Sequence, residues 1–166
     1  MPRWEPEHIV EQSVLERLID REPRESQEMA PTRAQSVRQL KASLRRDLDW
    51  LLNSRRTPEA AGPEYQELER SVFNYGLPDL TSLSWQSARD RQRLSRIIEN
   101  ALQIFEPRLR GIRVIPIGEL SGTQFVLRFQ IEGMLQMSPA PEHISFDTVL
   151  QLASGEYQVK GDASAG

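Results

Sequence analysis

The chain has 166 residues, no cysteine and a formal net charge of -3 at pH 7. This length suffices for one domain with its own hydrophobic core. The lack of cysteine excludes disulfides and thiolate metal sites and fits a reducing compartment, while the acidic balance argues against a general nucleic-acid binder. No apolar run approaches the roughly 18 residues of a membrane-spanning helix, and residues 1–7 lack the apolar core of a secretion signal. We therefore expect a cytoplasmic protein without direct membrane insertion.

Residues 1–33 are predicted to form an extension outside the core domain. Residues 13–20 favour a short helix with one apolar stripe, made of Val14, Leu15, Leu18 and Ile19. Residues 21–33 are charged, contain Pro23 and Pro31, and are typical of a linker. Because so short a helix is only marginally stable alone, we expect it to fold back on the core or to dock on a partner.

The next predicted helix covers residues 36–53. Its apolar side chains follow helical spacing and form one stripe: Val37, Leu40, Leu44, Leu48, Leu51 and Leu52. Residues 54–64 contain prolines and a glycine and are predicted to be a loop. Residues 71–80 combine aromatic side chains with a glycine and a proline, which indicates a packed loop.

A second long amphipathic helix is predicted for residues 87–105. Its apolar face consists of Leu94, Ile97, Ile98, Ala101, Leu102 and Phe105. The positions expected to be mostly solvated are Arg89, Arg93, Arg96 and Glu99. Pro107 ends the helix, because its ring removes an amide donor and disfavours helical geometry at Glu106. The junction therefore places Glu106 and Arg108, two opposite charges, on either side of a proline.

After this junction the apolar pattern changes to a period of two, which is typical of β-strands. Ile112 and Val114 open a first strand that Pro116 is expected to limit. Two longer alternating runs follow at residues 125–132 and 144–152, the pattern of strands with one buried face.

A last short strand is predicted for residues 157–160. Helices first and antiparallel strands after them predict an α+β fold, with N-terminal helices packed on one face of a small antiparallel or mixed sheet formed by the C-terminal half. We expect the core domain to cover residues 34–160 and residues 161–166 to be a disordered tail.

The sequence does not present a convincing acid and base pair. Glu99 and Glu106 are offset by about 10.5 Å along the predicted helix, whereas the two carboxylates of a glycosidase lie roughly 5 to 9.5 Å apart. Arg108 favours the ionised form of Glu106, while a general acid must be protonated. Distant carboxylates such as Asp79 or Asp147 stay open as partners.

Metal and cofactor sites are not indicated either. His8 and His143 are the two histidines, and they are not in metal-ligand spacing. Gly111, Gly118 and Gly122 flank predicted strands, which is typical of turns and not of a phosphate-binding loop. We therefore predict no catalytic, cofactor-binding or metal-binding residue.

Two interpretations of Glu106 and Arg108 stay open at this point. They form an intramolecular ion pair that orients the corner, or they meet groups on another chain. Either interpretation requires a definite mate for each charge, because a buried charge without a partner is costly. The predicted sheet also has edge strands, which must be covered or can accept a strand from a neighbour.

Several segments, taken in order, resemble the TssE family of type VI secretion baseplate subunits. They are residues 14–20, 47–55, 71–80, 106–109 and 145–150, followed by a Ser-Gly turn. Ser54 stands where the family more often has threonine. TssE is similar to a contractile-phage baseplate wedge protein historically labelled lysozyme-like. The resemblance covers roughly residues 12 to 160.

The resemblance implies a structural protein without enzymatic activity or cofactor. TssE-like proteins form part of a baseplate wedge with TssF and TssG, alongside TssK, in a baseplate docked at the inner membrane. They also contact the first ring of the contractile TssB-TssC sheath. Their core resembles the interlocking domain of the sheath, in which neighbours exchange strands, so the resemblance implies that the sheet edge templates sheath assembly.

The resemblance also implies partner-binding residues. The Glu-Pro-Arg corner of the family is associated with docking onto the wedge, which carries over to Glu106, Pro107 and Arg108. The short N-terminal helix is implied as a second anchor through its apolar stripe: Val14, Leu15 and Leu18. Two alternatives stay open: the equivalent wedge protein of a contractile phage or phage-derived particle, and a peptidoglycan glycosidase.

Overall fold

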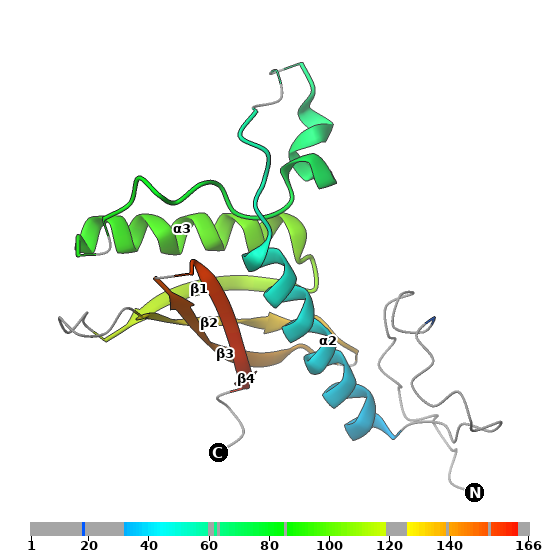
Figure 1. The fold of residues 1–166 in the computed structure, drawn as a ribbon. Helices are drawn as coiled ribbons and strands as arrows, with labels where there is room; N and C mark the ends of the chain where they lie inside the picture. Colours follow the sequence, from blue (N-terminus) through cyan, green and yellow to red (C-terminus); the bar gives the residue numbers. More distant parts are fainter. Residues whose placement is uncertain are drawn as a thin grey trace, which may run out of the picture.

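The computed structural model describes residues 18, 32–59, 62, 64–84, 86–118, 126–138, 140–152 and 154–162. Within these residues, two long helices come first and a four-stranded antiparallel sheet follows (Figure 1). The helices come from the N-terminal half and the strands from the C-terminal half, which confirms the predicted α+β fold.

The first long helix, α2, covers Arg33–Asn53 and begins before the predicted start at residue 36. A capping box accounts for the earlier start, because the Thr32 hydroxyl accepts from the Gln35 amide and the Gln35 side chain accepts from the Thr32 amide. The predicted apolar stripe is confirmed. Its buried members are Leu40, Leu44, Leu48, Leu51 and Leu52.

Residues 56–76, the excursion, leave the core and return to it at the same place. Arg55 and Leu77 form a parallel bridge there, and the Leu77 amide donates to the Ser54 carbonyl over 2.9 Å. The return needs a glycine at position 76, because its φ is 103° and a Cβ would lie 2.5 Å from the Ser54 carbonyl oxygen.

Two short 3-10 helices, η1 (Gln66–Arg70) and η2 (Val72–Asn74), lie in the excursion, which stands away from the sheet in Figure 1. The predicted packed loop is confirmed by Leu77 and Leu80, which are both buried. Val72, in contrast, is 91% exposed. The excursion is therefore anchored at its base and exposed farther out.

The second long helix, α3, covers Ala88–Phe105, within one residue of the prediction. Ser87 caps its first turn by accepting from the Asp90 amide. The apolar face predicted for this helix points into the core, with four members buried: Leu94, Ile98, Ala101 and Leu102. The helix ends at Phe105 with Glu106 as its C-cap, as the proline at position 107 predicts.

Four strands follow in the order β1 (Leu109–Ile117), β2 (Val126–Leu135), β3 (Glu142–Gln151) and β4 (Glu156–Asp162). The predicted limits of the first strand are wrong at both ends. It starts directly after the corner, and it continues through Pro116, which pairs with Phe129. Proline fits there because β1 is an edge strand.

The last strand extends farther than predicted. β4 continues to Asp162, which pairs with Phe146 on β3. Gly161 and Asp162 therefore belong to the sheet and not to a disordered tail. The other residues of the predicted tail, 163–166, lie outside the described residues.

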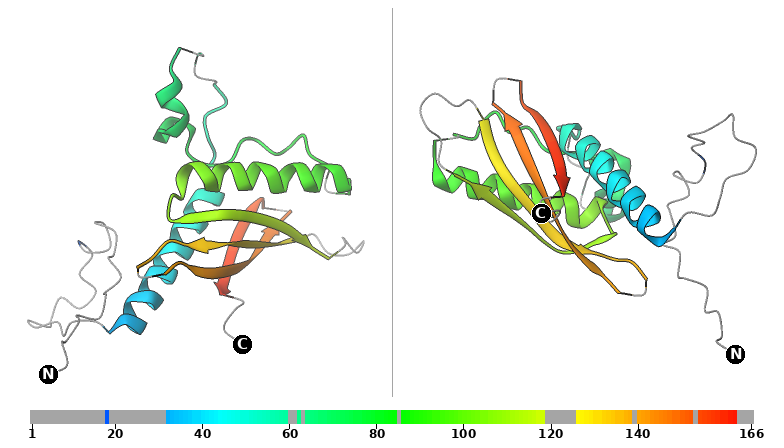
Figure 2. Two further views of the ribbon diagram at one scale, coloured as in Figure 1. Left: turned by 180° about the vertical axis from the view of Figure 1, so that it is seen from behind. Right: turned by 90° about the horizontal axis from the view of Figure 1, so that it is seen from below.

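Both long helices pack against the sheet, and no helix among the described residues lies over its other face. α3 lies along β1, and α2 lies along β4, as the two views of Figure 2 also show. The core fills the space between them. Its large fully buried side chains include Leu44, Leu48, Leu94, Leu102, Phe129 and Phe146.

The core also holds a tyrosine whose hydroxyl group has no acceptor or donor among the described residues. Tyr157 of β4 is 2% exposed, and its hydroxyl is buried without a hydrogen-bond partner. Burial raises the pKa of this phenol, although the charge of Arg55 acts in the opposite direction. The folded state therefore favours the neutral phenol.

We predict that Tyr157→Phe raises the free energy of unfolding by about 1 kcal/mol, because it removes a buried unsatisfied hydroxyl. A raised pKa stabilises the folded state below the ordinary value of 10.0 and loses that contribution as pH rises. The stability of the variant should therefore fall less steeply above pH 10 than that of the parent. Urea unfolding between pH 7 and 11 measures both effects, and a loss of stability at pH 7 would contradict them.

Candidate partner-binding site

The corner between α3 and β1 is a tight turn held by its own backbone. The Glu106 amide continues the helix by donating to the Leu102 carbonyl over 2.9 Å, and the Leu109 amide donates to the Glu106 carbonyl over 3.1 Å. Pro107 lies between them and is exposed. Helix and strand therefore meet without a flexible connection, and the proline forms the outer surface of the turn.

Inside this turn, Arg108 binds Glu106 with two side-chain hydrogen bonds. Its Nε donates to Oε1 and its Nη2 donates to Oε2, each over 2.5 Å, and its backbone amide also approaches Oε1 at 3.3 Å. Glu106 is only 5% exposed. Each of the two charges therefore has the oppositely charged partner that burial requires, and that partner lies within the same chain.

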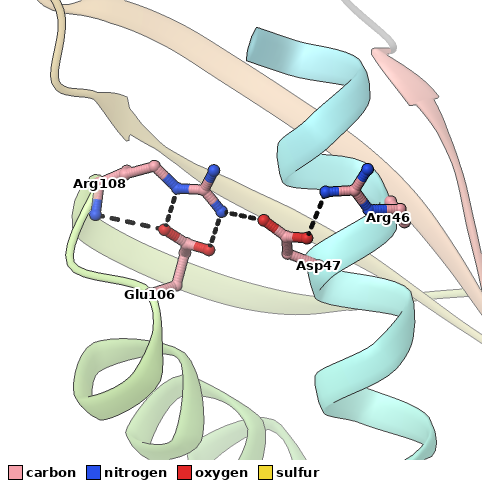
Figure 3. Close-up of polar contacts among 4 residues, drawn as sticks. All are labelled: Arg46, Asp47, Glu106 and Arg108. Carbon is pink, nitrogen blue, oxygen red and sulfur yellow. Dashed lines mark hydrogen bonds and ion pairs between the residues drawn. The ribbon is translucent and has the colours of Figure 1, made fainter. Parts of the chain in front are cut away.

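A third charge, Asp47, connects this pair to α2 (Figure 3). Arg108 Nη2 donates to Asp47 Oδ2 over 2.6 Å, and Arg46 Nη2 donates to Asp47 Oδ1 over 3.2 Å. The Arg46 guanidinium also lies 5.2 Å from the centroid of the Trp50 ring, which is 57% exposed. The charges thus alternate in sign from the buried Glu106 to the surface of α2.

Sequence analysis missed the role of Asp47, although a signal for it exists. Asp47 follows Leu44 by three residues and precedes Leu51 by four, so it lies on the apolar stripe of α2. A carboxylate on a buried stripe needs a cationic partner. Which cation it meets depends on the packing of the corner against α2.

The electrostatics of the corner favour permanent charges. Burial alone would lower the pKa of Arg108, but the hydrogen bonds and charges of Glu106 and then Asp47 outweigh it and raise this pKa. Burial, followed by the charges of Asp47 and Glu106, raises the pKa of Tyr75. Tyr75 contacts Phe105 edge to face, with centroids 5.3 Å apart, so an aromatic pair lies beside the cluster.

The corner still offers groups to a partner. All carboxylate oxygens of Glu106 and Asp47 accept hydrogen bonds within the cluster. The Nη1 group of Arg108, however, has no acceptor among the described residues. A partner would thus meet the exposed ring of Pro107 and the remaining donors of Arg108, both held in a fixed position.

Three of the four carboxylates considered for acid and base chemistry are engaged elsewhere, and the fourth, Asp147, is half-buried on β3. Glu99, which we expected to be mostly solvated, is half-buried and accepts from the Val114 amide over 2.8 Å. Asp79 accepts from the amide and hydroxyl of Thr81, and these bonds lower its pKa. Together with the clamped Glu106, this geometry does not support a general acid and base pair at these positions.

Within the described part of the chain, no group of three or more His, Cys, Asp or Glu side chains could hold a metal ion. His143 of β3 is exposed, and His8 lies outside the described residues. No helix in that part of the chain is long and apolar enough to cross a membrane.

The predicted N-terminal anchor falls almost entirely outside the described residues. Of its apolar stripe, Leu18 is described; it is helical and 76% exposed. Val14 and Leu15 are not described. The anchor therefore stays a prediction.

The β4 edge of the sheet is filled by side chains of α2. Val159 donates its amide to Asp49 Oδ1 and accepts from Arg45 Nε at its carbonyl, both over 2.8 Å. The Asn53 side chain binds both backbone groups of Tyr157: its Oδ1 accepts from the Tyr157 amide over 2.8 Å, and its Nδ2 donates to the Tyr157 carbonyl over 2.9 Å. These side chains recur every four residues along α2 and replace a fifth strand.

The β1 edge is covered less completely. Glu99 occupies the Val114 amide, and Pro116 has no amide hydrogen to offer. Both features remove donors from the edge, which natural sheets use to limit unwanted pairing. Among the described residues, no side chain donates a hydrogen bond to the carbonyl groups of this edge. The β1 edge is therefore the more accessible of the two.

The comparisons with known proteins give one finding. The family model of the baseplate wedge protein gp25 matches residues 38–140, from α2 through β2, and includes the corner at residues 106–108. The chain belongs to this family. TssE belongs to it too, so the family resemblance in the sequence is confirmed. No curated protein and no solved structure matched the gp25-family chain.

We predict that Arg108→Ala lowers the free energy of unfolding by about 3 kcal/mol, because it leaves the buried Glu106 carboxylate unpaired. Asp47→Asn should cost about 1 kcal/mol, since it weakens one charged contact at the rim of the cluster. Guanidinium unfolding measures both. Arg110→Ala, at an exposed arginine two residues farther along, is the matched control and should change stability little. Equal effects of Arg108→Ala and Arg110→Ala would contradict the buried pair.

We also predict that Asn53→Ala lowers the free energy of unfolding by about 2 kcal/mol, because both backbone groups of Tyr157 lose their partners. Asn53→Asp keeps the acceptor for the amide but places a carboxylate oxygen opposite a carbonyl, so it should not restore full stability. Arg38→Ala, an exposed position on the same helix, serves as the control. Hydrogen exchange should show faster exchange of the Tyr157 amide in the alanine variant only.

Proposed function

We propose that this gp25-family chain is the TssE-type subunit of a type VI secretion baseplate, located in the cytoplasm in a baseplate docked at the inner membrane. It would link the wedge, made of TssF and TssG with TssK, to the contractile TssB-TssC sheath. The observation that carries the proposal is the family match over residues 38–140. The ordered TssE-like segments at 14–20 and 145–150, outside this match, support the more specific assignment.

Docking onto the wedge is assigned to the corner. Glu106 and Arg108 fix the turn internally, so the contact itself falls to exposed Pro107 and the Nη1 group of Arg108. A preorganised corner binds without the entropic cost of ordering a loop, which favours affinity. Val14, Leu15 and Leu18 of the N-terminal segment would add an apolar anchor.

Sheath templating is assigned to the β1 edge. The β4 edge is already satisfied by α2, so a sheath strand would have to displace several hydrogen bonds there. On β1 a strand would find unoccupied carbonyl groups and would have to supply the donors itself. Strand addition of this kind gives affinity through main-chain hydrogen bonds.

The second candidate is the equivalent wedge protein of a contractile phage or phage-derived particle, because the matched family is that of a baseplate wedge protein. Genes for TssF and TssG beside this gene would identify a secretion system, and genes for capsid and tail fibres would identify a particle. Peptidoglycan cleavage that is lost in Glu106→Gln would instead identify a glycosidase and overturn the structural role.

The corner can be tested without disturbing its ion pair. Pro107→Asp changes the exposed tip and should reduce co-purification with TssF and TssG by about tenfold, as expected for a lost contact of roughly 1.4 kcal/mol. The variant should stay folded with a modest loss of stability from the missing proline, because Glu106 and Arg108 keep each other as partners.

Gln158→Asp is the control, since it introduces the same charge at an exposed position of β4, at the opposite end of the strand order from β1. It should leave co-purification unchanged. Undiminished binding of Pro107→Asp would refute the docking role of the corner, and equal loss in both variants would show an effect of added charge alone.

A further inference from the structure

The exposed side of α3 carries a row of arginines that the proposed function does not use. Arg89, Arg93 and Arg96, the arginine ridge, are spaced by four and three residues and thus share one face of the helix. All three are exposed, and none has a hydrogen bond or ion pair with any described residue. They span about 10.5 Å along the helix axis.

The carboxylates of α3, of the corner and of the loop before α3 do not form ion pairs with this ridge, because each accepts hydrogen bonds from another group. Asp90 accepts from the Ser84 amide, Glu99 accepts from the Val114 amide, and Glu106 binds Arg108. Asp79, in the loop before the helix, is engaged with Thr81. The whole chain has a net charge of -3, so this positive face is a local feature and not a reflection of overall composition.

The ridge continues into a groove. Asn100 lies one turn beyond Arg96 on the same face and lines a groove of about 470 Å³ between the excursion and the C-terminal half of α3. Ile104 and Tyr65, which are 44% and 58% exposed, form the apolar part of this groove. Its lining also contains Arg56 and the carboxylates of Glu59 and Glu69. The arginine ridge therefore leads along α3 into a groove of mixed polarity, whose apolar part lies at Ile104.

We propose that this surface binds an acidic segment of another protein, with carboxylates on the arginine ridge and an apolar side chain in the groove beside Ile104. Arginine pairs with carboxylates through two parallel hydrogen bonds, and exposed large apolar side chains next to such a row provide an anchor. A nucleic acid would present phosphates and planar bases instead of carboxylates and an aliphatic side chain, and it is included below as a competitor.

The arginine ridge is separate from the corner, and the groove lies between the two. The ridge occupies the N-terminal half of α3, whereas Glu106 and Arg108 follow its C-terminal end. One helix would then carry contacts at both ends, to two different partners or to two parts of one assembly. The inference holds whether or not the corner binds the wedge.

Fluorescence anisotropy with a labelled 16-residue helical peptide tests the proposal. The peptide carries glutamates on one face and a leucine near one end, and a second peptide has serine in place of that leucine. Replacing Arg89, Arg93 and Arg96 together by alanine should weaken binding of the first peptide by about tenfold, as expected for the loss of several exposed ion pairs. Binding should also weaken as salt is raised.

The control variant replaces three exposed arginines on other elements, Arg38, Arg110 and Arg128, by alanine and removes the same charge. It should change affinity less than twofold. Ile104→Ser should weaken the leucine peptide severalfold and leave the serine peptide unchanged.

Equal weakening by both triple variants would overturn the proposal, because charge alone would then explain binding. The same holds if Ile104→Ser has no effect, or if a single-stranded oligonucleotide or an anionic phospholipid vesicle competes more strongly than the leucine peptide. Circular dichroism of each variant confirms that loss of binding is not loss of fold.

Discussion

The ion pair between Arg108 and the buried Glu106, together with the contact from Arg108 to Asp47, is the interaction on which the arrangement of the helices and the sheet depends. It joins α2, the end of α3 and the start of β1 at one point (Figure 3). Because Glu106 is nearly excluded from water, its charge has to be compensated at that point. Proline fixes the backbone between the two charges, so steric and electrostatic constraints act on the same turn.

A second constraint concerns the edges of the sheet. An open antiparallel sheet has two unpaired edges, and this chain treats them differently. Side chains of α2 supply both donors and acceptors to β4, which makes the helix a substitute for a neighbouring strand. On β1 one amide is occupied by a glutamate and another position has no amide hydrogen. The β4 edge is therefore closed by α2, whereas β1 keeps carbonyl groups without a side-chain partner among the described residues.

These features agree with a structural component of a baseplate, the role that the family indicates. Asp79, Glu106 and Glu99 are committed to backbone amides and to arginine, so these carboxylates stabilise the fold. Membership of the baseplate wedge family agrees with such a role. The surfaces left for partners are the exposed turn at Pro107, the β1 edge and the arginine ridge of α3 with its groove.

The sequence by itself determined the elements whose causes are local. Helical spacing of leucines, alternation in the strands and the helix stop at Pro107 depend on neighbours within a few residues, and they were predicted correctly. Tertiary structure alone decided the roles of the polar side chains. Three carboxylates have hydrogen-bond partners far away in the sequence: 61 residues for Asp47, 15 for Glu99 and 110 for Asp49. The residues that flank each carboxylate do not indicate which partner it will have. The same holds for β1, which continues through Pro116 because the strand lies at an edge. A hydrogen bond or ion pair over such separations exists only once the core has packed and brought the two groups together.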